Sequence, residues 1–464
     1  MSRSHRSTRR HFIKTLGAGV AAPFFIPNLI SAPPSQRVRH ASFGADGMAS
    51  SDWLEFSNLP NVEIVCIAEV DLSRLSEVNK RYKTGAPKIY QDWREMLDKE
   101  HKNLDSVNVG TPDHMHAPMA MSAMQLGLHA YVQKPLAHDL YEVRRLTEYA
   151  REKKLVTQMG IQVHSEDKYR DAVALIRGGA IGKVKEVHTW SNKKWGDAEP
   201  PADKSDPVPA ALNWDWWVGV CEPRPFIEGF YHPSKWRKQI DFGTGTFGDM
   251  GCHIYDPVFE SLGVTAPVSV RSEGPAPGPK SWAINAKIRY EFPGTPFTEG
   301  KTVSVTWYDG DNIPPPEIID QIGADEAREL PSQGSIFIGT GGVMLLPHTE
   351  KKKPDGHGKM TSRPLRGPVL LPAEKFKDFA RPKNETTSHW AQFINAIRGE
   401  GKASAPFDYS GPLTEAVLLG SVASFFPDTT LEWDAAKLEF KNAADANRHV
   451  RRSYRNGWEV NGLG

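Results

Sequence analysis

The sequence predicts an α/β protein in which a doubly wound parallel sheet is followed by a second, strand-rich region. Between residues 36 and 160, apolar strand-like runs alternate with helical runs. A glycine-rich turn follows the first of these strands. After Gly182, several runs show the period-two alternation of half-buried strands. This order of elements is typical of an α/β sheet protein with a second α/β domain.

Length and composition indicate a soluble globular enzyme. The chain has 464 residues, 39% hydrophobic and 24% charged, which is enough for two or three cores. Its 57 basic and 56 acidic residues nearly cancel, and no basic stripe points to nucleic acid or to a membrane surface. Cys66, Cys221 and Cys252 are too few and too scattered for a disulfide framework or a metal site.

The first 35 residues are interpreted as a twin-arginine export signal. Arg9 and Arg10 precede an uncharged run from Thr15 to Gln36. A membrane anchor is the competing interpretation, but Pro23 and Pro27 interrupt the apolar stretch before it reaches the roughly 20 residues of a spanning helix. We therefore expect export to the periplasm by the twin-arginine machinery, without an integral membrane span. That route carries folded proteins, so a cofactor would be loaded before export.

The first strand and its turn predict a phosphate-binding loop. The strand is expected at 38–43, and residues 44–49 (Gly-Ala-Asp-Gly-Met-Ala) lead into a helix. Backbone N–H groups at the start of that helix would then point at a dinucleotide pyrophosphate, with Gly44, Gly47 and Met48 as cofactor-binding residues. Asp46 stands where the middle glycine of G-x-G-x-x-G is expected, so its carboxylate must turn away or the loop must bind the cofactor differently.

An acidic pair after the second strand indicates the ribose site. The strand expected at 62–68 ends in Glu69-Val70-Asp71, close to the spacing of about 20 residues after the glycine turn. We take Glu69 as the first candidate for the ribose hydroxyls and Asp71 as its neighbour. A carboxylate there favours NAD, while Arg74 would also suit the 2′-phosphate of NADP.

Further helices and strands complete a six-stranded parallel sheet. Helices are expected at 72–82, 93–99, 117–126 and 140–153, and strands at 88–90, 106–110, 129–133 and 156–161. Ligands of such sheets bind beyond the carboxyl ends of the strands. The polar residues that follow two strands should therefore face the cofactor: Thr111, Pro112, His114, His116 and Lys134. The two histidines lack a third ligand nearby, so we expect no metal site.

Three motifs together resemble the Gfo/Idh/MocA superfamily, which includes glucose-fructose oxidoreductase and inositol dehydrogenase. They are Thr-Pro-Asp-His-Met-His at 111–116, Gln-Lys-Pro at 133–135, where the family usually has Glu-Lys-Pro, and Gly-Asp-Met-Gly-Cys-His-Ile-Tyr-Asp at 248–256. The resemblance covers the chain after the export signal. It implies a Rossmann domain over residues 36–160. It also implies a C-terminal α/β domain over 161–464, with a large, mostly antiparallel open sheet that covers the nicotinamide and supports a homo-oligomer.

The expected chemical centre consists of Lys134, Asp249 and His253. Residues 249 and 253 are four apart, so on a helix they share one face. Oxidation of a secondary alcohol needs a base for the hydroxyl proton, which suits His253. Lys134 would stabilise alkoxide character on the reacting oxygen. Asp249 would orient the histidine or bind a neighbouring sugar hydroxyl.

The walls of the substrate site are expected in the segment before that helix. Trp214, Trp216 and Trp217 are equally consistent with a packed turn in the core. Gln162 and Arg170 would border the site or bond between domains. The residues taken as substrate-binding, besides Asp249 and His253, are Gln162, Arg170, Tyr231, His232, Trp236 and Arg237.

These features predict an exported NAD(P)-dependent oxidoreductase that acts on a sugar, a polyol or a sugar derivative. Free NAD should be scarce outside the cytoplasm, so the cofactor would be tightly retained and regenerated in place. The alternative within the superfamily is a redox-neutral cycle that cleaves a glycoside, as a hydrolase or lyase. A non-catalytic carbohydrate- or nucleotide-binding protein is a third interpretation, which Asp46 supports and the trio Lys134, Asp249 and His253 opposes.

Overall fold

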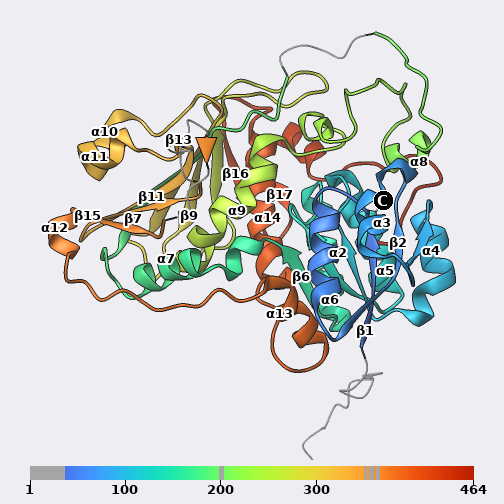
Figure 1. Ribbon diagram of the computed structural model, residues 1–464. Coiled ribbons are helices and arrows are strands. Elements are labelled where there is room, and N and C mark those ends of the chain that lie inside the picture. The colour runs from blue at the N-terminus through green and yellow to red at the C-terminus, as the bar shows by residue number, and fades with distance from the viewer. Residues whose placement is uncertain (1–36, 198–202, 350–352, 355–359, 362–365, 464) are drawn as a thin grey trace, which may run out of the picture. The chain divides into compact units, whose positions relative to one another are not determined.

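The first sheet is parallel and six-stranded, as the sequence predicts (Figure 1). The computed structural model describes residues 37–197, 203–349, 353–354, 360–361 and 366–463. The strand order is β3-β2-β1-β4-β5-β6, and each pairing is parallel. The strands are β1 (Val38–Phe43), β2 (Val62–Ala68), β3 (Lys88–Tyr90), β4 (Ser106–Val109), β5 (His129–Gln133) and β6 (Thr157–Gly160).

Helices cover this sheet on both faces, because its strands alternate apolar side chains between two separate cores. Phe43 and Val109 belong to one core, which α4, α5 and α6 complete, whereas Ile64 and Tyr131 belong to the other, with α2. The helices are α2 (Met48–Asn58), α3 (Ser76–Arg81), α4 (Trp93–Glu100), α5 (His116–Gln125) and α6 (Leu140–Lys153).

A helix from late in the chain completes the second of these cores. Phe393 and Ile394 of α13 (His389–Ile397) are buried there beside Phe56 and Tyr131. Trp390 of the same helix donates through Nε1 to Asp52 of α2 at 2.9 Å. The C-terminal part of the sequence therefore supplies one helix to the first sheet.

The second sheet is nine-stranded and almost entirely antiparallel, which confirms the expected fold class. Its order is β15-β12-β11-β7-β10-β9-β8-β16-β17, and β10 with β7 is its parallel pair among the described pairings. The strands are β7 (Val184–Ser191), β8 (Ser269–Ser272), β9 (Lys287–Pro293), β10 (Thr302–Asp309), β11 (Gln333–Gly339), β12 (Val343–Pro347), β15 (Val369–Leu371), β16 (Thr430–Asp434) and β17 (Glu439–Phe440).

Two long helices lie between the sheets and fix the site. The helix α9 (Gly245–Leu262) packs against α7 (Asp167–Arg177), β7 and α14 (Phe407–Ala423), and α14 also packs against α6 and β6. The remaining elements are short: α8 (Trp214–Val218), α10 (Pro316–Ile319), α11 (Gly323–Arg328), α12 (Ala373–Phe376) and the pair β13 (Lys353–Pro354) and β14 (Met360–Thr361).

Several predicted boundaries are wrong for identifiable reasons. The helix expected at 72–82 is a 3-10 turn, Leu72–Arg74, followed by α3, because the Asp71 side chain accepts from the Ser73 N–H and caps the turn. Near the end of the chain, the sequence pattern predicts a helix over 413–424, but α14 starts at Phe407 and contains Pro412. A proline in a helix interior removes a hydrogen bond, so the pattern favours a later start.

The predicted twin-arginine segment lies outside the described residues. Within the described part of the chain, no helix combines the length and the apolar character needed to cross a membrane.

The glycine turn is held by a close approach of α2 to two strand ends. A Cβ atom on Gly44, whose φ is +103°, would lie 2.7 Å from the Ala49 Cβ. A Cβ atom on Gly110, just after β4, would lie 2.7 Å from both the Cα and the Cβ of Ala49. The first turn of α2 therefore sits directly on the carboxyl ends of β1 and β4.

Replacing Gly110 with alanine tests this seating. We expect Gly110→Ala to destabilise the protein by about 1–3 kcal/mol, because a methyl group must displace the start of α2. Gly401→Ala is the matched control, since a Cβ there meets no atom within 4 Å. Thermal or urea unfolding measures both, and equal stability of the two variants would contradict this packing.

Candidate functional site

One large cavity runs along the carboxyl edge of the parallel sheet, where ligands of such sheets bind. Its volume is about 690 Å³. One end is lined by the glycine turn and the residues after β2, and the other by Lys134 and α9. The lining includes Gly44, Asp46, Gly47, Met48, Glu69, Arg74, Thr111, Pro112, His116, Lys134, Lys193, Trp216, Trp217, His232, Trp236, Arg237, Asp249 and His253.

At the glycine-turn end, the Asp46 carboxylate is neutralised by Arg74. Their side chains form an ion pair at 2.6 Å, and Asp46 Oδ1 accepts from the Gly47 N–H at 2.7 Å. No side chain caps α2, which begins at Met48. The start of a helix without a side-chain cap offers N–H groups to an anion, and the Gly44 turn leaves no room for a Cβ. These residues fit a dinucleotide pyrophosphate.

Glu69 binds the turn itself. Its Oε2 accepts from the Ala45 N–H and its Oε1 from the Asp71 N–H, both at 2.9 Å. Burial raises the pKa of Glu69 to about 6. Glu69 lies at the end of β2, at the expected ribose position, and it also ties the glycine turn to that strand.

The connection between β7 and α9 is hydrogen-bonded to the chain near this acid. Asp71 Oδ2 accepts from the ring Nε2 of His232 at 2.9 Å. The Leu72 N–H donates to the Ala211 carbonyl at 2.9 Å, and the Asn213 N–H donates to the Val70 carbonyl at 3.2 Å. The segments around residues 211–213 and 232 are thereby fastened to the chain directly after β2.

The two histidines after β4 differ in position. His116 lines the cavity, and its ring nitrogens lie 2.7 Å from the Pro135 carbonyl and 2.8 Å from the Thr111 carbonyl. His114 is fully buried against Trp217 and Phe242, and burial lowers its pKa to about 3. The structure therefore brings Thr111, Pro112 and His116 to the cavity but not His114.

At the other end, the carboxylate of Asp249 joins side chains from three parts of the fold. Its Oδ1 accepts from Lys134 Nζ at 2.8 Å and from Arg237 Nε at 3.1 Å. Its Oδ2 accepts from Lys193 Nζ at 3.0 Å and from Trp195 Nε1 at 2.8 Å. Lys134 Nζ also donates to the Asp249 main-chain carbonyl at 2.7 Å. Although burial opposes it, these cations hold the pKa of Asp249 well below its usual range.

His253 lines the same end as a neutral imidazole. Burial, and then the charge of Lys134, lower the pKa of His253 to about 3. Its Nδ1 is buried without a hydrogen-bond partner among the described residues. Nε2 is therefore the ring nitrogen available to a molecule in the cavity.

Lys193 and Trp195 follow β7 and were not among the residues singled out from the sequence. Their signal in the sequence is a Lys-Lys-Trp run directly after a strand-like segment. However, their contact with Asp249 depends on how the two sheets meet. The Asp249 carboxylate is thus occupied by these donors and by Lys134 and Arg237, and not by the His253 ring.

Only some of the residues expected to bind substrate line the cavity. His232, Trp236 and Arg237 line the cavity, and so do Trp216 and Trp217. Three other residues lie elsewhere. Tyr231 packs among Trp214, Trp217 and Phe242, Gln162 donates to the Tyr131 hydroxyl at 3.2 Å, and Arg170 donates to the Glu385 carbonyl at 2.6 Å.

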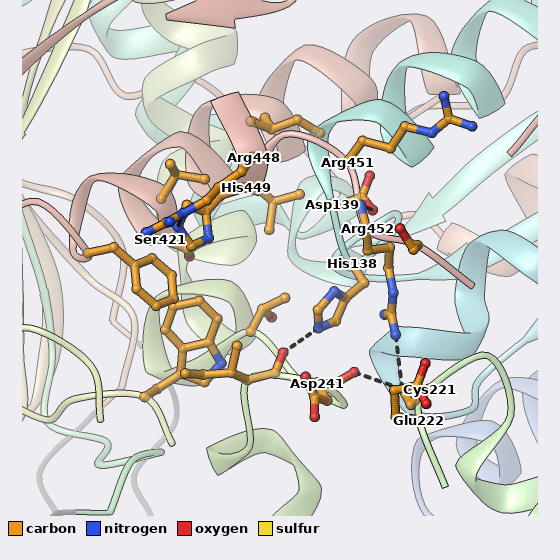
Figure 2. Close-up of a pocket in the computed structure, with 18 of the residues that line it drawn as sticks. His138, Asp139, Cys221, Glu222, Asp241, Ser421, Arg448, His449, Arg451 and Arg452 are labelled. Atoms are coloured by element: carbon orange, nitrogen blue, oxygen red, sulfur yellow. Dashed lines mark hydrogen bonds between the residues drawn. The ribbon is translucent and has the colours of Figure 1, made fainter. Parts of the chain in front are cut away.

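A second cavity, of about 310 Å³, is lined by the loop that precedes α9, by α14 and by residues from the segment 448–453 (Figure 2). Arg224 pairs with Asp241 at 2.6 Å, and Arg452 donates to the Cys221 sulfur at 2.9 Å. Figure 2 shows Arg451 directed away from the others. The cavity contains none of Lys134, Asp249 and His253, so we assign the chemistry to the larger one.

One cluster among the described residues has the composition of a metal site: His164, Asp256 and Glu260. His164 Nδ1 is 2.8 Å from Asp256 Oδ1, and the Tyr409 hydroxyl donates to the same oxygen at 2.7 Å. Burial opposes protonation of His164, but Asp256 and then Glu260 raise its pKa to about 9. The imidazolium itself supplies the positive charge between the two carboxylates.

Comparisons with known proteins agree with this architecture. The model of the Gfo/Idh/MocA oxidoreductase family, NAD-binding Rossmann fold, matches residues 38–161, and the model of its C-terminal alpha/beta domain matches residues 181–298. Together the two models match just over half of the chain. Residues 38–161, which contain the first sheet, form an NAD-binding Rossmann domain.

Individual relatives are distant. A levoglucosan dehydrogenase of Pseudarthrobacter phenanthrenivorans is 25% identical over 190 residues, 41% of this chain and 40% of that protein. An alpha-N-acetylgalactosaminidase of Shewanella oneidensis is 26% identical over 208 residues, 39% of this chain and 45% of that protein. The chain thus matches less than half the length of either relative.

The fold also matches solved structures. GenD2 from gentamicin A biosynthesis, in complex with NAD, superimposes with a TM-score of 0.58 at 16% identity. The match covers 87% of this chain and 99% of GenD2. At this identity the likeness shows the fold alone.

Proposed function

The chain belongs to the Gfo/Idh/MocA oxidoreductase family, and on this premise we propose that it transfers a hydride between a bound nicotinamide and the carbon that bears a secondary hydroxyl of a sugar, polyol or sugar derivative. One observation carries the proposal: Lys134, Asp249 and His253 line one end of the cavity whose other end is the dinucleotide-binding turn. A hydroxyl held at that end would have a neutral base and an ammonium group within the same cavity.

His253 is the group that accepts the hydroxyl proton, at Nε2. Its low pKa keeps the ring unprotonated throughout the physiological range. Lys134 uses two of its three N–H bonds on Asp249, so the third is available to the reacting oxygen. A charged donor at that oxygen stabilises developing negative charge. The nicotinamide, when bound, supplies the hydride acceptor.

Removing the imidazole should abolish most turnover. We expect His253→Ala to reduce kcat by roughly 10²–10⁴-fold, as is usual for a general base, with cofactor content unchanged. In the wild-type protein, kcat/KM should show no loss attributable to protonation of His253 between about pH 5 and 8, because its pKa is about 3. His449→Ala, in the second cavity, is the matched control. Wild-type turnover in His253→Ala would remove this residue from the mechanism.

We also propose that the cofactor is retained between turnovers. The hydrogen bonds from residues 72, 213 and 232 fasten two segments beside the expected ribose position. We infer that a dinucleotide bound beside them leaves more slowly while these bonds are closed. Retention requires regeneration in place, either by a second sugar or by return of the hydride to the same substrate.

His232→Phe tests the retention by removing the N–H while keeping the ring volume. Loss of one hydrogen bond to a carboxylate is worth about 1.5–3 kcal/mol, so we expect release of bound nucleotide to become at least about tenfold faster. Tyr231→Phe, the neighbouring residue, should leave release unchanged. Mass spectrometry of the nucleotide that remains after gel filtration measures both variants, and identical retention would contradict the role of the Asp71–His232 bond.

Redox-neutral glycoside cleavage is the second candidate. Two observations favour it: the hydrogen bonds beside the expected ribose position, which support a retained cofactor, and the similarity to an alpha-N-acetylgalactosaminidase. Mass spectrometry of the nucleotide released by denaturing the purified protein identifies the cofactor. A substrate screen that measures both reduced nicotinamide and sugar products then separates the two candidates. Cleavage of a glycoside without net reduction would favour the second, whereas an oxidised sugar with net reduction would favour the first.

Export to the periplasm by the twin-arginine route, and assembly into a homo-oligomer through the C-terminal sheet, complete the proposal. Export is supported by Arg9 and Arg10 before an uncharged run. Oligomerisation rests on the family resemblance, and size-exclusion chromatography with light scattering would contradict it by finding a monomer.

Conservative replacement of the arginine pair tests export. We expect Arg9→Lys with Arg10→Lys to leave the protein in the cytoplasm, because lysine keeps the charge but lacks the guanidinium that such a signal presents. Arg3→Lys with Arg6→Lys should export normally. Cell fractionation and blotting give the readout, and periplasmic localisation of the first double variant would exclude this signal.

A further inference from the structure

The Asp249 carboxylate has no remaining acceptor capacity. A carboxylate offers about four lone-pair sites. Lys134, Arg237, Lys193 and Trp195 occupy them from the protein side. A substrate hydroxyl therefore has no free acceptor on Asp249 in this arrangement, and Asp249 acts by holding its donors in place.

The donors, by contrast, are far from saturated. Lys193 uses one of its three N–H bonds on Asp249, and Arg237 uses its Nε there and a long contact of Nη1 with the Ser234 carbonyl at 3.4 Å. Their side chains are 40% and 25% exposed, and both line the cavity. Lysine and arginine can only donate, so a ligand that excludes water from them must bring acceptor oxygens.

The charges at this end of the cavity do not balance. Lys134, Lys193 and Arg237 are three cations. The carboxylates that face them are Asp249 and the more deeply buried Asp113, which accepts from the Thr244 hydroxyl at 2.7 Å. The remaining acids of the lining, Asp46 and Glu69, belong to the glycine-turn end, where Arg74 pairs with Asp46. One positive charge is left over at the reactive end.

We propose that the substrate is an acidic sugar, one whose oxyanion group binds Lys193 and Arg237 while its hydroxyl meets Lys134 and His253. This proposal rests on the proposed hydride transfer and names its substrate class. A neutral sugar would satisfy some of the N–H groups but would leave the excess charge in a cavity from which water is displaced, which is costly. The planar fork of Arg237 suits a carboxylate or a phosphate.

The size of the cavity limits the substrate to a small molecule. About 690 Å³ must also accommodate the dinucleotide, so the space beside α9 suits one sugar unit. Trp236 and Trp216 line the cavity and offer apolar faces for such a ring.

An oxyanion in this position would also assist the base. The pKa of His253 is low because of burial and because of the positive charges of Lys134 and Lys193. A bound anion opposes those charges and raises the pKa of the imidazole, which makes it a stronger acceptor for the hydroxyl proton. Substrate charge and base strength are thereby linked.

The test compares matched sugars on the holoenzyme with its own bound nicotinamide. Glucose, galactose and mannose are each paired with the corresponding uronate and 6-phosphate, and single-turnover reduction of the bound nicotinamide gives the rate and the apparent Kd. We expect at least one acidic member to exceed its neutral partner by at least about tenfold in rate over Kd, the scale of one charge-assisted contact. Comparison of the uronates with the 6-phosphates shows whether the site prefers a carboxylate or a phosphate.

Two adjacent lysines give the matched variants. Lys193→Met should weaken binding of the acidic sugar by at least about tenfold and affect the neutral partner much less. Lys194→Met should change neither, because Lys194 pairs with Asp311 outside the cavity. The acidic-sugar proposal would be overturned if a neutral sugar reacted better than its acidic partners, or if Lys193→Met weakened binding of the acidic and the neutral sugar equally. Either result would leave the proposed hydride transfer standing. Failure of every sugar to reduce the nicotinamide would overturn both.

Discussion

The reactive end of the cavity depends on one buried carboxylate, that of Asp249. It receives Lys134 from the end of β5, Lys193 from the end of β7 and Arg237 from the segment before α9. These donors come from the parallel sheet, the antiparallel sheet and the connection between them. Without the carboxylate, three cations would face each other in a partly desolvated space, an arrangement that costs several kcal/mol unless the side chains move apart. The same ion cluster therefore positions the chemical groups and joins the two sheets at the point where substrate would bind.

The two ends of the cavity differ in how their charges are compensated. At the glycine turn, each acid has a partner: Asp46 has Arg74, Asp71 has His232, and Glu69 has two backbone N–H groups. The aspartate that replaces a glycine in the turn is thus neutralised by an arginine one strand away, and its repulsion of a pyrophosphate is reduced accordingly. At the reactive end, the donors outnumber the acceptors. A dinucleotide would meet acids that are already hydrogen-bonded at one end, and a substrate would meet unsatisfied donors at the other.

The sequence carries the information for the parts of this site that depend on local pattern. The strand and helix alternation places the glycine turn, Glu69 and Lys134 at one sheet edge, and the spacing of Asp249 and His253 on a helix places both at the same cavity. Contacts that depend on how distant segments meet were not predictable. Lys193 and Trp195 reach Asp249 only because β7 ends beside α9, and α13 covers the first sheet from more than 200 residues away. His114 and Tyr231 carry suitable functional groups, but their rings are buried in an aromatic cluster that includes Trp217 and Phe242. Residue type alone does not separate a ring that lines a cavity from one that packs beside it.

The cluster around Asp249 would also set the balance of the proposed proton transfer. A positive charge lowers the pKa of every acid near it, so Lys134 weakens the imidazole of His253 as a base while making a hydroxyl beside it a stronger acid. Both effects fall with distance, so the transfer is helped only where the hydroxyl lies closer to the ammonium group than the imidazole does. Lys134 is held by two bonds to Asp249, one to the carboxylate and one to the main-chain carbonyl, which fixes the ammonium group relative to α9. In the proposed mechanism, the position of the lysine, as well as the intrinsic basicity of the histidine, therefore determines how readily the proton leaves the hydroxyl.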